Sequence, residues 1–136
     1  MRYLMVNIMI VSHSYHLAKG LAKLLEDVKT TNVFIIDYSG GLDVETIGTD
    51  YVDINTKVNN LLTANNNDLI IICDLGSSIM TSEMVIDGLD LNNQQRVMIA
   101  KTPFVEGGFV AVGLSSVCDT VADLYMKMVE QLPIIK

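Results

Sequence analysis

Short apolar runs alternate along this chain with longer stretches of helical periodicity. The strand-like runs are residues 3–11, Val33 to Asp37, Leu69 to Cys73 and Arg96 to Ala100. After the first run, apolar residues recur at helical spacing at Leu17, Leu21, Leu24, Leu25 and Val28. This alternation is typical of βαβ units with a parallel sheet, and near-continuous apolar strands suit burial on both faces. We therefore predict an α/β fold with helices on both faces of a central sheet.

The order of the strands follows from the way parallel strands connect. Right-handed crossovers favour a doubly wound sheet in which the first strand lies between the second and the third. We predict the strand order 2-1-3-4 in a mostly parallel sheet, as in a flavodoxin-like three-layer sandwich. Further helices are predicted around Val52 to Leu62, around Met84 to Leu89 and after Pro103. Ser116 and Asp119 resemble a capping box for a last helix that runs to about Gln131.

Composition narrows the classes of partner. The 136 residues fit one domain, 1–136, and carry 9 basic against 16 acidic residues, for a net charge of -7. Because nucleic-acid affinity depends on cationic side chains that neutralise phosphates, we expect no nucleic-acid partner. No apolar run reaches the ~20 residues of a membrane-spanning helix, and Cys73 and Cys118 have no second thiol or histidine at metal-ligand spacing. We expect a cytoplasmic protein with reduced cysteines, no metal and no membrane contact.

Two ionisable side chains follow apolar runs at the point where each strand is expected to end. His13 stands in Ser12-His13-Ser14 after the first run, and Asp74 follows the third. If these strands are neighbours, both side chains lie in the crevice at the carboxyl end of the sheet. A carboxylate that accepts one ring N–H fixes the tautomer of an imidazole and raises the basicity of the other nitrogen. We predict that Asp74 orients His13 for nucleophilic attack or phosphoryl transfer.

Loops rich in glycine and serine are predicted at the same edge of the sheet. They contain Gly40 and Gly41, Gly48 and Thr49, and Gly76 with Ser77 and Ser78. Backbone N–H groups in such loops and at helix starts can hold phosphoryl oxygens. We expect these loops, together with Ser12 and Ser14, to contact the phosphoryl group or a partner. The connection from Tyr38 to Gly48 also has the length of a functional loop.

Each of these residues also has a simpler interpretation. His13 could be an ordinary loop residue, Asp74 could cap the helix that follows, and the glycines could serve only tight turns. The chain has no Gly-x-x-x-x-Gly-Lys-Ser/Thr, no Gly-x-Gly-x-x-Gly after the first strand, no Gly-x-Ser-x-Gly elbow and no His and Cys cluster for zinc. We therefore expect no directly bound cofactor, with any nucleotide held on another protein.

A set of motifs along the chain resembles a known family. They are Val6-Asn7 leading into Ile10-Val11-Ser12-His13-Ser14, Ile47-Gly48-Thr49-Asp50, Asp74-Leu75-Gly76-Ser77 with Glu83 following, and Pro103-Phe104-Val105-Glu106-Gly107. In this order the motifs resemble the phosphotransferase subunit of the phosphoenolpyruvate-dependent dihydroxyacetone kinase, which is related to the mannose-type IIA domains of the sugar phosphotransferase system. The resemblance covers essentially the whole chain. Gly108 and the linker from Gly40 to Glu45 depart from the pattern.

The resemblance implies a homodimer of flavodoxin-like subunits whose His13 accepts a phosphoryl group from the phosphocarrier protein HPr. It implies that the group sits on Nε2 of His13, with Asp74 orienting the ring, and then passes to ADP bound on a partner kinase subunit. Dihydroxyacetone is thereby phosphorylated at the expense of phosphoenolpyruvate. Larger members append HPr-like and enzyme I-like domains, so a chain ending at Lys136 is expected to be the stand-alone form. Its apolar end, Leu132 to Ile135, is expected to pack on a neighbour.

Other functional classes share parts of this pattern. The nearest alternative is the IIA component of a mannose-type sugar transporter, which has the same histidine chemistry and a different recipient. Lys101-Thr102-Pro103 resembles the Lys-Pro pair of a receiver domain, but Ser12-His13 stands where a receiver needs an acidic pair for Mg²⁺. A flavin-binding electron carrier is disfavoured because the chain has no Trp on which to stack a flavin ring. A pure binding or dimerisation module remains open if His13 is inert.

Overall fold

The computed structural model describes residues 4–133, so the predicted strand start at residue 3 and the end of the apolar tail lie outside the described residues. The elements are β1 Val6–Ser12, α1 Tyr15–Val28, β2 Ile36–Gly40, α2 Tyr51–Ala64, β3 Asp68–Cys73, α3 Gly76–Asp87, α4 Leu91–Gln94, β4 Val97–Ala100, α5 Phe104–Ser115 and α6 Val121–Gln131. The strands form one sheet in the order β2-β1-β3-β4. Every pairing in it is parallel, and the predicted topology is confirmed.

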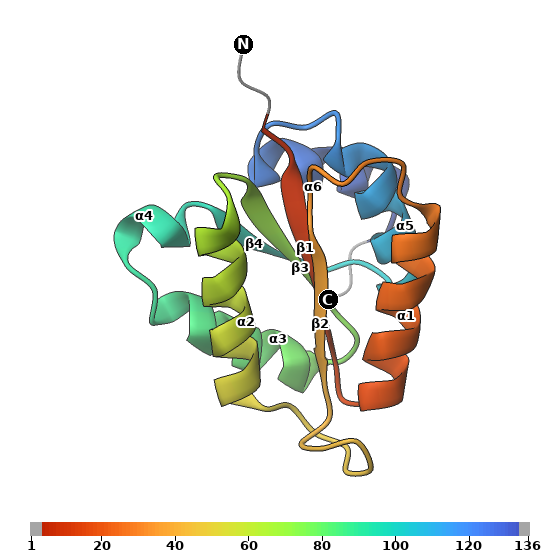
Figure 1. Ribbon diagram of the computed structural model, residues 1–136, viewed down its shortest axis with the longest axis vertical. Helices are drawn as coiled ribbons and strands as arrows, with labels where there is room; N and C mark the ends of the chain where they lie inside the picture. The colour runs from red at the N-terminus through yellow and green to blue at the C-terminus, as the bar shows by residue number, and fades with distance from the viewer. Residues whose placement is uncertain (1–3, 134–136) are drawn as a thin grey trace.

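Helices cover both faces of the sheet, as Figure 1 shows. On one face, α1, α5 and α6 bury a cluster that includes Ile8, Ile10, Ile70 and Ile72. On the other face, α2 and α3 bury alternate residues of the same strands, including Met9 and Ile71. Because side chains alternate across a strand, the continuous apolar runs supply both clusters. The result is the predicted three-layer sandwich.

The second strand begins later than predicted, at Ile36 instead of Val33. Val33 is 50% exposed, whereas Phe34 turns into the core before the strand starts. The register pairs Ile36 with Ile8 and extends to Gly40 beside Ser12. β2 ends the strand order, and such an edge strand can include polar residues, so the apolar run Val33 to Asp37 was a poor guide to its bounds.

The start of the last helix also differs from the prediction. Thr120, not Ser116, caps α6, and its side chain accepts a hydrogen bond from the N–H of Asp123. Ser116 is instead the C-cap of α5. The segment between the two helices places Cys118 in the core, fully buried. The capping-box pattern therefore occurs twice in this stretch, and burial of Cys118 selects the later one.

The remaining expectations about the helices have mixed outcomes. The small apolar stretch after Pro103 forms α5, where Gly107 and Gly108 are buried against neighbouring elements. The short helix α4 has no counterpart among the predicted elements. Within residues 4–133, no helix combines the length and the hydropathy needed to cross a membrane.

Candidate functional site

The site forms where β1 and β3 end side by side. Val11 pairs with Cys73 across the sheet, and the N–H of Asp74 donates to the carbonyl of Val11 at 3.2 Å. The next residue along β1 is Ser12, followed by His13 in the loop to α1. Nδ1 of His13 lies 3.0 Å from Oδ1 of Asp74. The predicted juxtaposition of His13 and Asp74 is confirmed.

The carboxylate of Asp74 is surrounded by hydrogen-bond donors. Its Oδ1 faces Nδ1 of His13 and accepts from the Ser78 hydroxyl at 2.8 Å and the Leu75 N–H at 2.7 Å. Its Oδ2 accepts from the Ser12 hydroxyl at 2.8 Å and the His13 N–H at 3.1 Å. Burial alone would raise the pKa of Asp74, but the hydrogen bonds from Ser12, His13 and Ser78 outweigh it and lower the pKa from its ordinary value. Asp74 is therefore an ionised acceptor.

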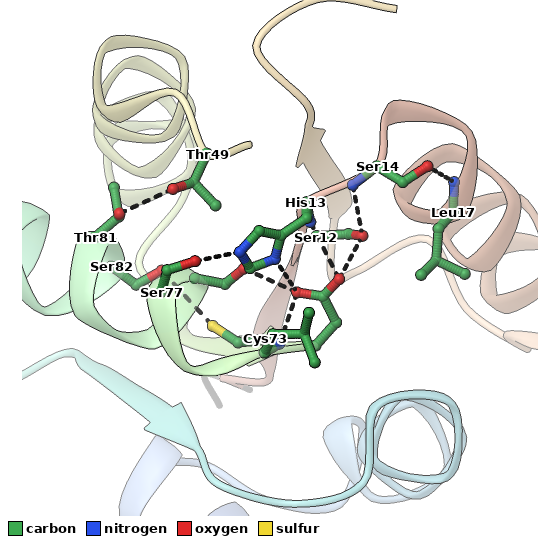
Figure 2. A network of polar contacts seen from close by, with 12 residues as sticks. Ser12, His13, Ser14, Leu17, Thr49, Cys73, Ser77, Thr81 and Ser82 are labelled. Carbon is green, nitrogen blue, oxygen red and sulfur yellow. Dashed lines mark hydrogen bonds and ion pairs between the residues drawn. The ribbon is translucent and has the colours of Figure 1, made fainter. Parts of the chain in front are cut away.

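This acceptor selects the tautomer of the His13 ring. Because Asp74 has no proton to give, the hydrogen between Nδ1 and Oδ1 belongs to the ring. The neutral ring then carries its lone pair on Nε2, where the Ser77 hydroxyl donates to it (Figure 2). The His13 side chain is 21% exposed. The arrangement presents a basic, partly accessible nitrogen at the end of the sheet, suited to attack on an electrophile.

Ser12 and Ser14, which are predicted to contact a phosphoryl group or a partner, have structural roles beside the ring. Ser12 is fully buried, donates to Asp74 and accepts from the N–H of Ser14 at 3.0 Å. Its burial leaves no exposed surface for a partner protein, and contact of Ser12 with a phosphoryl group stays a prediction. Ser14 is the N-cap of α1, and its hydroxyl accepts from the N–H of Leu17. A sequence motif alone does not reveal which of these hydroxyls faces inward.

The glycine loops do converge near His13, as predicted, although they serve the backbone there. The N–H of Gly48 donates to the carbonyl of His13 at 2.9 Å, and that of Gly41 donates to the carbonyl of Ser12 at 3.3 Å. Both glycines have positive φ, 143° and 73°, which disfavours other residues. Thr49 holds the same loop to α3 through the Thr81 hydroxyl (Figure 2). The N–H groups of Gly41 and Gly48 thus donate to protein carbonyls, and contact of these loops with a phosphoryl group or a partner stays a prediction.

The start of α3 brings further groups to the ring. Leu75 is its N-cap and provides no side-chain cap, and Gly76 is its first residue. Asp74 is therefore not the N-cap of this helix, and that alternative is wrong. Free N–H groups at a helix start are suited to bind an anion. Ser78 was predicted only as part of the loop at Gly76, and its contact with the ring, 3.1 Å from its hydroxyl to Nδ1 of His13, was missed; its spacing of four residues from Asp74 at a helix start was the available signal.

A cavity of about 460 Å³ lies beside Asp74, between the start of α3 and the loop after β4. Its lining is largely apolar and includes Leu75, Met80 and Cys73, with Lys101 as the cationic member. Burial raises the pKa of the Cys73 thiol to about 12, so this cysteine stays protonated and is a poor nucleophile. Among residues 4–133, no group of His, Cys, Asp and Glu side chains is arranged to hold a metal ion.

Comparison with known proteins places this site in a family. Residues 7–125 match the EIIA-man family, described as the PTS system fructose IIA component. The chain belongs to this family.

Curated relatives of the chain carry more specific names. It is 34% identical over 108 residues to "PEP-dependent dihydroxyacetone kinase 2, phosphoryl donor subunit DhaM" of Listeria innocua, covering 79% of this chain and 83% of that protein. It is 35% identical over 109 residues to "PTS-dependent dihydroxyacetone kinase, phosphotransferase subunit DhaM" of Lactococcus lactis, covering 79% and 80%. A DhaM subunit of Providencia stuartii is 32% identical, and the match spans 24% of that longer protein.

Solved structures share the fold. The "unknown function protein EF1359" superposes with a TM-score of 0.79 at 24% identity, covering 95% of both chains. The phosphotransferase system component EIIA from Streptococcus agalactiae superposes with a TM-score of 0.65 at 16% identity, covering 93% of this chain and 91% of that one. These likenesses agree with the sheet order and flanking helices described above.

Proposed function

We propose that this protein is a phosphohistidine carrier that accepts a phosphoryl group from HPr on Nε2 of His13 and passes it to ADP on a dihydroxyacetone kinase subunit. The observation that carries the proposal is the hydrogen bond between Nδ1 of His13 and the ionised Asp74. It leaves the nucleophilic lone pair on the ring nitrogen that faces outward. The names of the relatives from Listeria and Lactococcus support dihydroxyacetone kinase as the system served.

The proposed chemistry needs only a correctly oriented His13 ring and a proton that stays on its Nδ1. The Nε2 lone pair attacks phosphorus in line, the bond from phosphorus to the donor's nitrogen breaks, and its electron pair returns to the donor. The Ser77 hydroxyl, which lies against Nε2, has to turn away to make room. Asp74 keeps the proton on Nδ1, so the ring leaves as neutral imidazole when the β-phosphate oxygen of ADP attacks in the second step. N–H groups at the start of α3 can donate to the phosphoryl oxygens.

The surface around His13 suits a protein partner. Leu42, Val44 and Ile47 are exposed on the loop between β2 and α2, and Leu75 and Met80 are exposed at the start of α3. Clustered exposed apolar side chains beside a reactive group are typical of a docking surface, and methionine adapts its shape to different partners. A carrier that meets a donor and an acceptor in turn needs such a surface. HPr and the kinase subunit are the partners we propose.

A second candidate is the IIA component of a sugar transporter. The description of the matched family as a fructose IIA component favours it. Both candidates share the histidine chemistry and differ in the acceptor protein. We also propose that the protein is a cytoplasmic homodimer, as the family resemblance implies.

The test is phosphorylation followed by transfer. With phosphoenolpyruvate, enzyme I and HPr, the wild-type chain should become labelled, and the label should survive base and be lost in acid, as expected of phosphohistidine. His13→Ala should abolish labelling, and His16→Ala, on the exposed face of α1, serves as the matched control. Labelling that persists undiminished in His13→Ala would defeat the proposal. Adding the kinase subunit with ADP and dihydroxyacetone should then discharge the label; discharge only by a sugar-transporter IIB protein would favour the second candidate.

A further inference from the structure

Ser78 contacts the His13 ring on the same side as Asp74. Its hydroxyl oxygen lies 3.1 Å from Nδ1 of His13 and 2.8 Å from Oδ1 of Asp74. The residue is fully buried in the first turn of α3. Groups from separate elements therefore meet at one ring nitrogen: a carboxylate at the end of β3 and a hydroxyl from α3.

The protons at this junction can be assigned from the chemistry of each group. Asp74 is ionised and only accepts, so the Ser78 O–H points to its Oδ1. A hydroxyl has one proton and two lone pairs, so the Ser78 oxygen can only accept from the ring. The hydrogen on Nδ1 thus lies between two acceptors, Oδ1 of Asp74 and Oγ of Ser78. Both contacts are compatible with the tautomer that leaves the lone pair on Nε2.

We propose that Ser78 is a positioning residue for His13, and this role rests on the function proposed above. The hydrogen bond from Nδ1 to Asp74 orients the imidazole but still lets it tilt about that one contact. A second acceptor from another direction narrows that tilt and fixes where Nε2 points. The donation from Ser78 to Asp74 holds the carboxylate in the same plane. Phosphoryl transfer is sensitive to such alignment, because the attacking atom must lie in line with the leaving group.

The proposal predicts a particular kinetic signature for Ser78→Ala. Removing a hydrogen bond to a charged group typically costs enough to slow a step about tenfold. We expect kcat for acceptance from phosphorylated HPr to fall about tenfold, with KM for HPr unchanged because buried Ser78 cannot touch the partner. The matched control is Ser82→Ala, which removes another fully buried serine hydroxyl from α3, next to Cys73 instead of the ring. Ser82→Ala should change neither constant.

A double-mutant cycle separates positioning from a general loss of stability. If Ser78 acts through the ring and its carboxylate, Ser78→Ala should cost much less in an Asp74→Asn background than in the wild type. Wild-type kinetics in Ser78→Ala, an equal loss in Ser82→Ala, or additive effects with Asp74→Asn would each overturn the role.

A small phosphoryl donor keeps this test independent of the partner proteins. With phosphoramidate, Nε2 attacks phosphorus, the P–N bond of the reagent breaks, and ammonia leaves. Ser78→Ala should slow labelling of His13 about tenfold here too, whereas Ser82→Ala should not. Loss of HPr-dependent labelling in the wild type, with this Ser78 effect retained, would refute the proposed function and leave the positioning role standing. HPr-dependent labelling without any effect of Ser78→Ala would refute the positioning role and leave the proposed function standing.

Discussion

The groups around Asp74 donate hydrogen bonds to its carboxylate. The tautomer of His13 depends on Asp74 acting only as an acceptor. An asparagine at this position keeps the shape but can offer its NH₂ group to Nδ1. The ring would then carry its proton on Nε2, the nitrogen that must attack. We predict that Asp74→Asn slows phosphoryl acceptance by about 10- to 100-fold, the usual cost of losing a hydrogen bond to a charged group at a reacting centre. The rate of labelling by phosphorylated HPr measures this effect.

The control for this prediction is Asp123→Asn. Asp123 pairs with Lys127 on α6, on a different helix from those that form the site. Its substitution should leave the labelling rate within about twofold of wild type, as expected for an exposed ion pair worth less than about 1 kcal/mol. A wild-type rate in Asp74→Asn would show that the carboxylate does not orient the ring.

The lowered pKa of Asp74 also predicts a contribution to stability that depends on pH. A group whose pKa is lower in the folded state stabilises the fold above its unfolded pKa and loses that contribution as pH falls through the folded value. The free energy of unfolding should therefore decline from about pH 5 downward more steeply in wild type than in Asp74→Asn. Urea unfolding at a series of pH values compares the two slopes. Parallel curves would mean that the hydrogen bonds to Asp74 do not favour its ionised form.

The sequence was informative for some site residues and silent for others. His13 and Asp74 could be placed because each follows an apolar run, and parallel strands end at a common edge. The roles of Ser12 and Ser78 could not be predicted, because they depend on the direction of a hydroxyl after two elements have packed. Ser78 reaches the ring only because α3 begins at Gly76, two residues after Asp74.

At the scale of elements, the buried strands were easier to predict than the edge strand. β1 and β3 are covered on both faces, so their apolar runs match their bounds within a few residues. β2 includes Ser39 and Gly40, which lie beyond the predicted run and which no hydrophobic pattern would select. The cap of α6 was also missed, since two capping patterns follow each other, Ser116 to Asp119 and Thr120 to Asp123, and the helix uses the second.

Gly40 shows how closely the end of β2 packs against the start of α1. A Cβ built on Gly40 would lie 2.3 Å from the carbonyl oxygen of Ser14 and 2.8 Å from Cβ of Ala18. Backbone on one side cannot yield easily, so we predict that Gly40→Ala destabilises the protein by about 1–3 kcal/mol, as overpacking does. Urea unfolding measures the change.

Gly20 provides the matched control for this substitution. It lies within α1, and nothing is found within 4 Å of its built Cβ. Gly20→Ala should stabilise the protein by about 0.5–1 kcal/mol through helix propensity. Equal effects from the two alanines would mean that Gly40 is not tightly packed.

At the scale of the whole molecule, the sheet topology was predictable because few arrangements satisfy right-handed crossovers. The way in which copies of the chain associate was not predictable, since the sequence pattern of a single chain does not say which surface a partner covers. β4 ends the sheet on one side and β2 on the other. Sheet edges are surfaces that proteins commonly cover or pair.

We predict that the protein is a homodimer in solution. Sedimentation equilibrium should give twice the 15.0 kDa mass of the chain. The edge strand β4, Val97–Ala100, is apolar, and a dimer that pairs through it should persist at high salt, which weakens exposed ion pairs. A mass of 15.0 kDa at every concentration tested would refute the dimer and would leave the proposed phosphorylation of His13 unaffected.

We propose that Asp74 holds the proton on Nδ1 so that Nε2 of His13 receives the phosphoryl group. The most direct measurement is nitrogen NMR of protein labelled with ¹⁵N-histidine and phosphorylated through phosphoenolpyruvate, enzyme I and HPr. We predict phosphorus coupling at Nε2 of His13, a proton retained on Nδ1, and an unchanged ring at His16, the other histidine of the chain. Phosphorus coupled to Nδ1 of His13, or to either nitrogen of His16, would contradict this proposal.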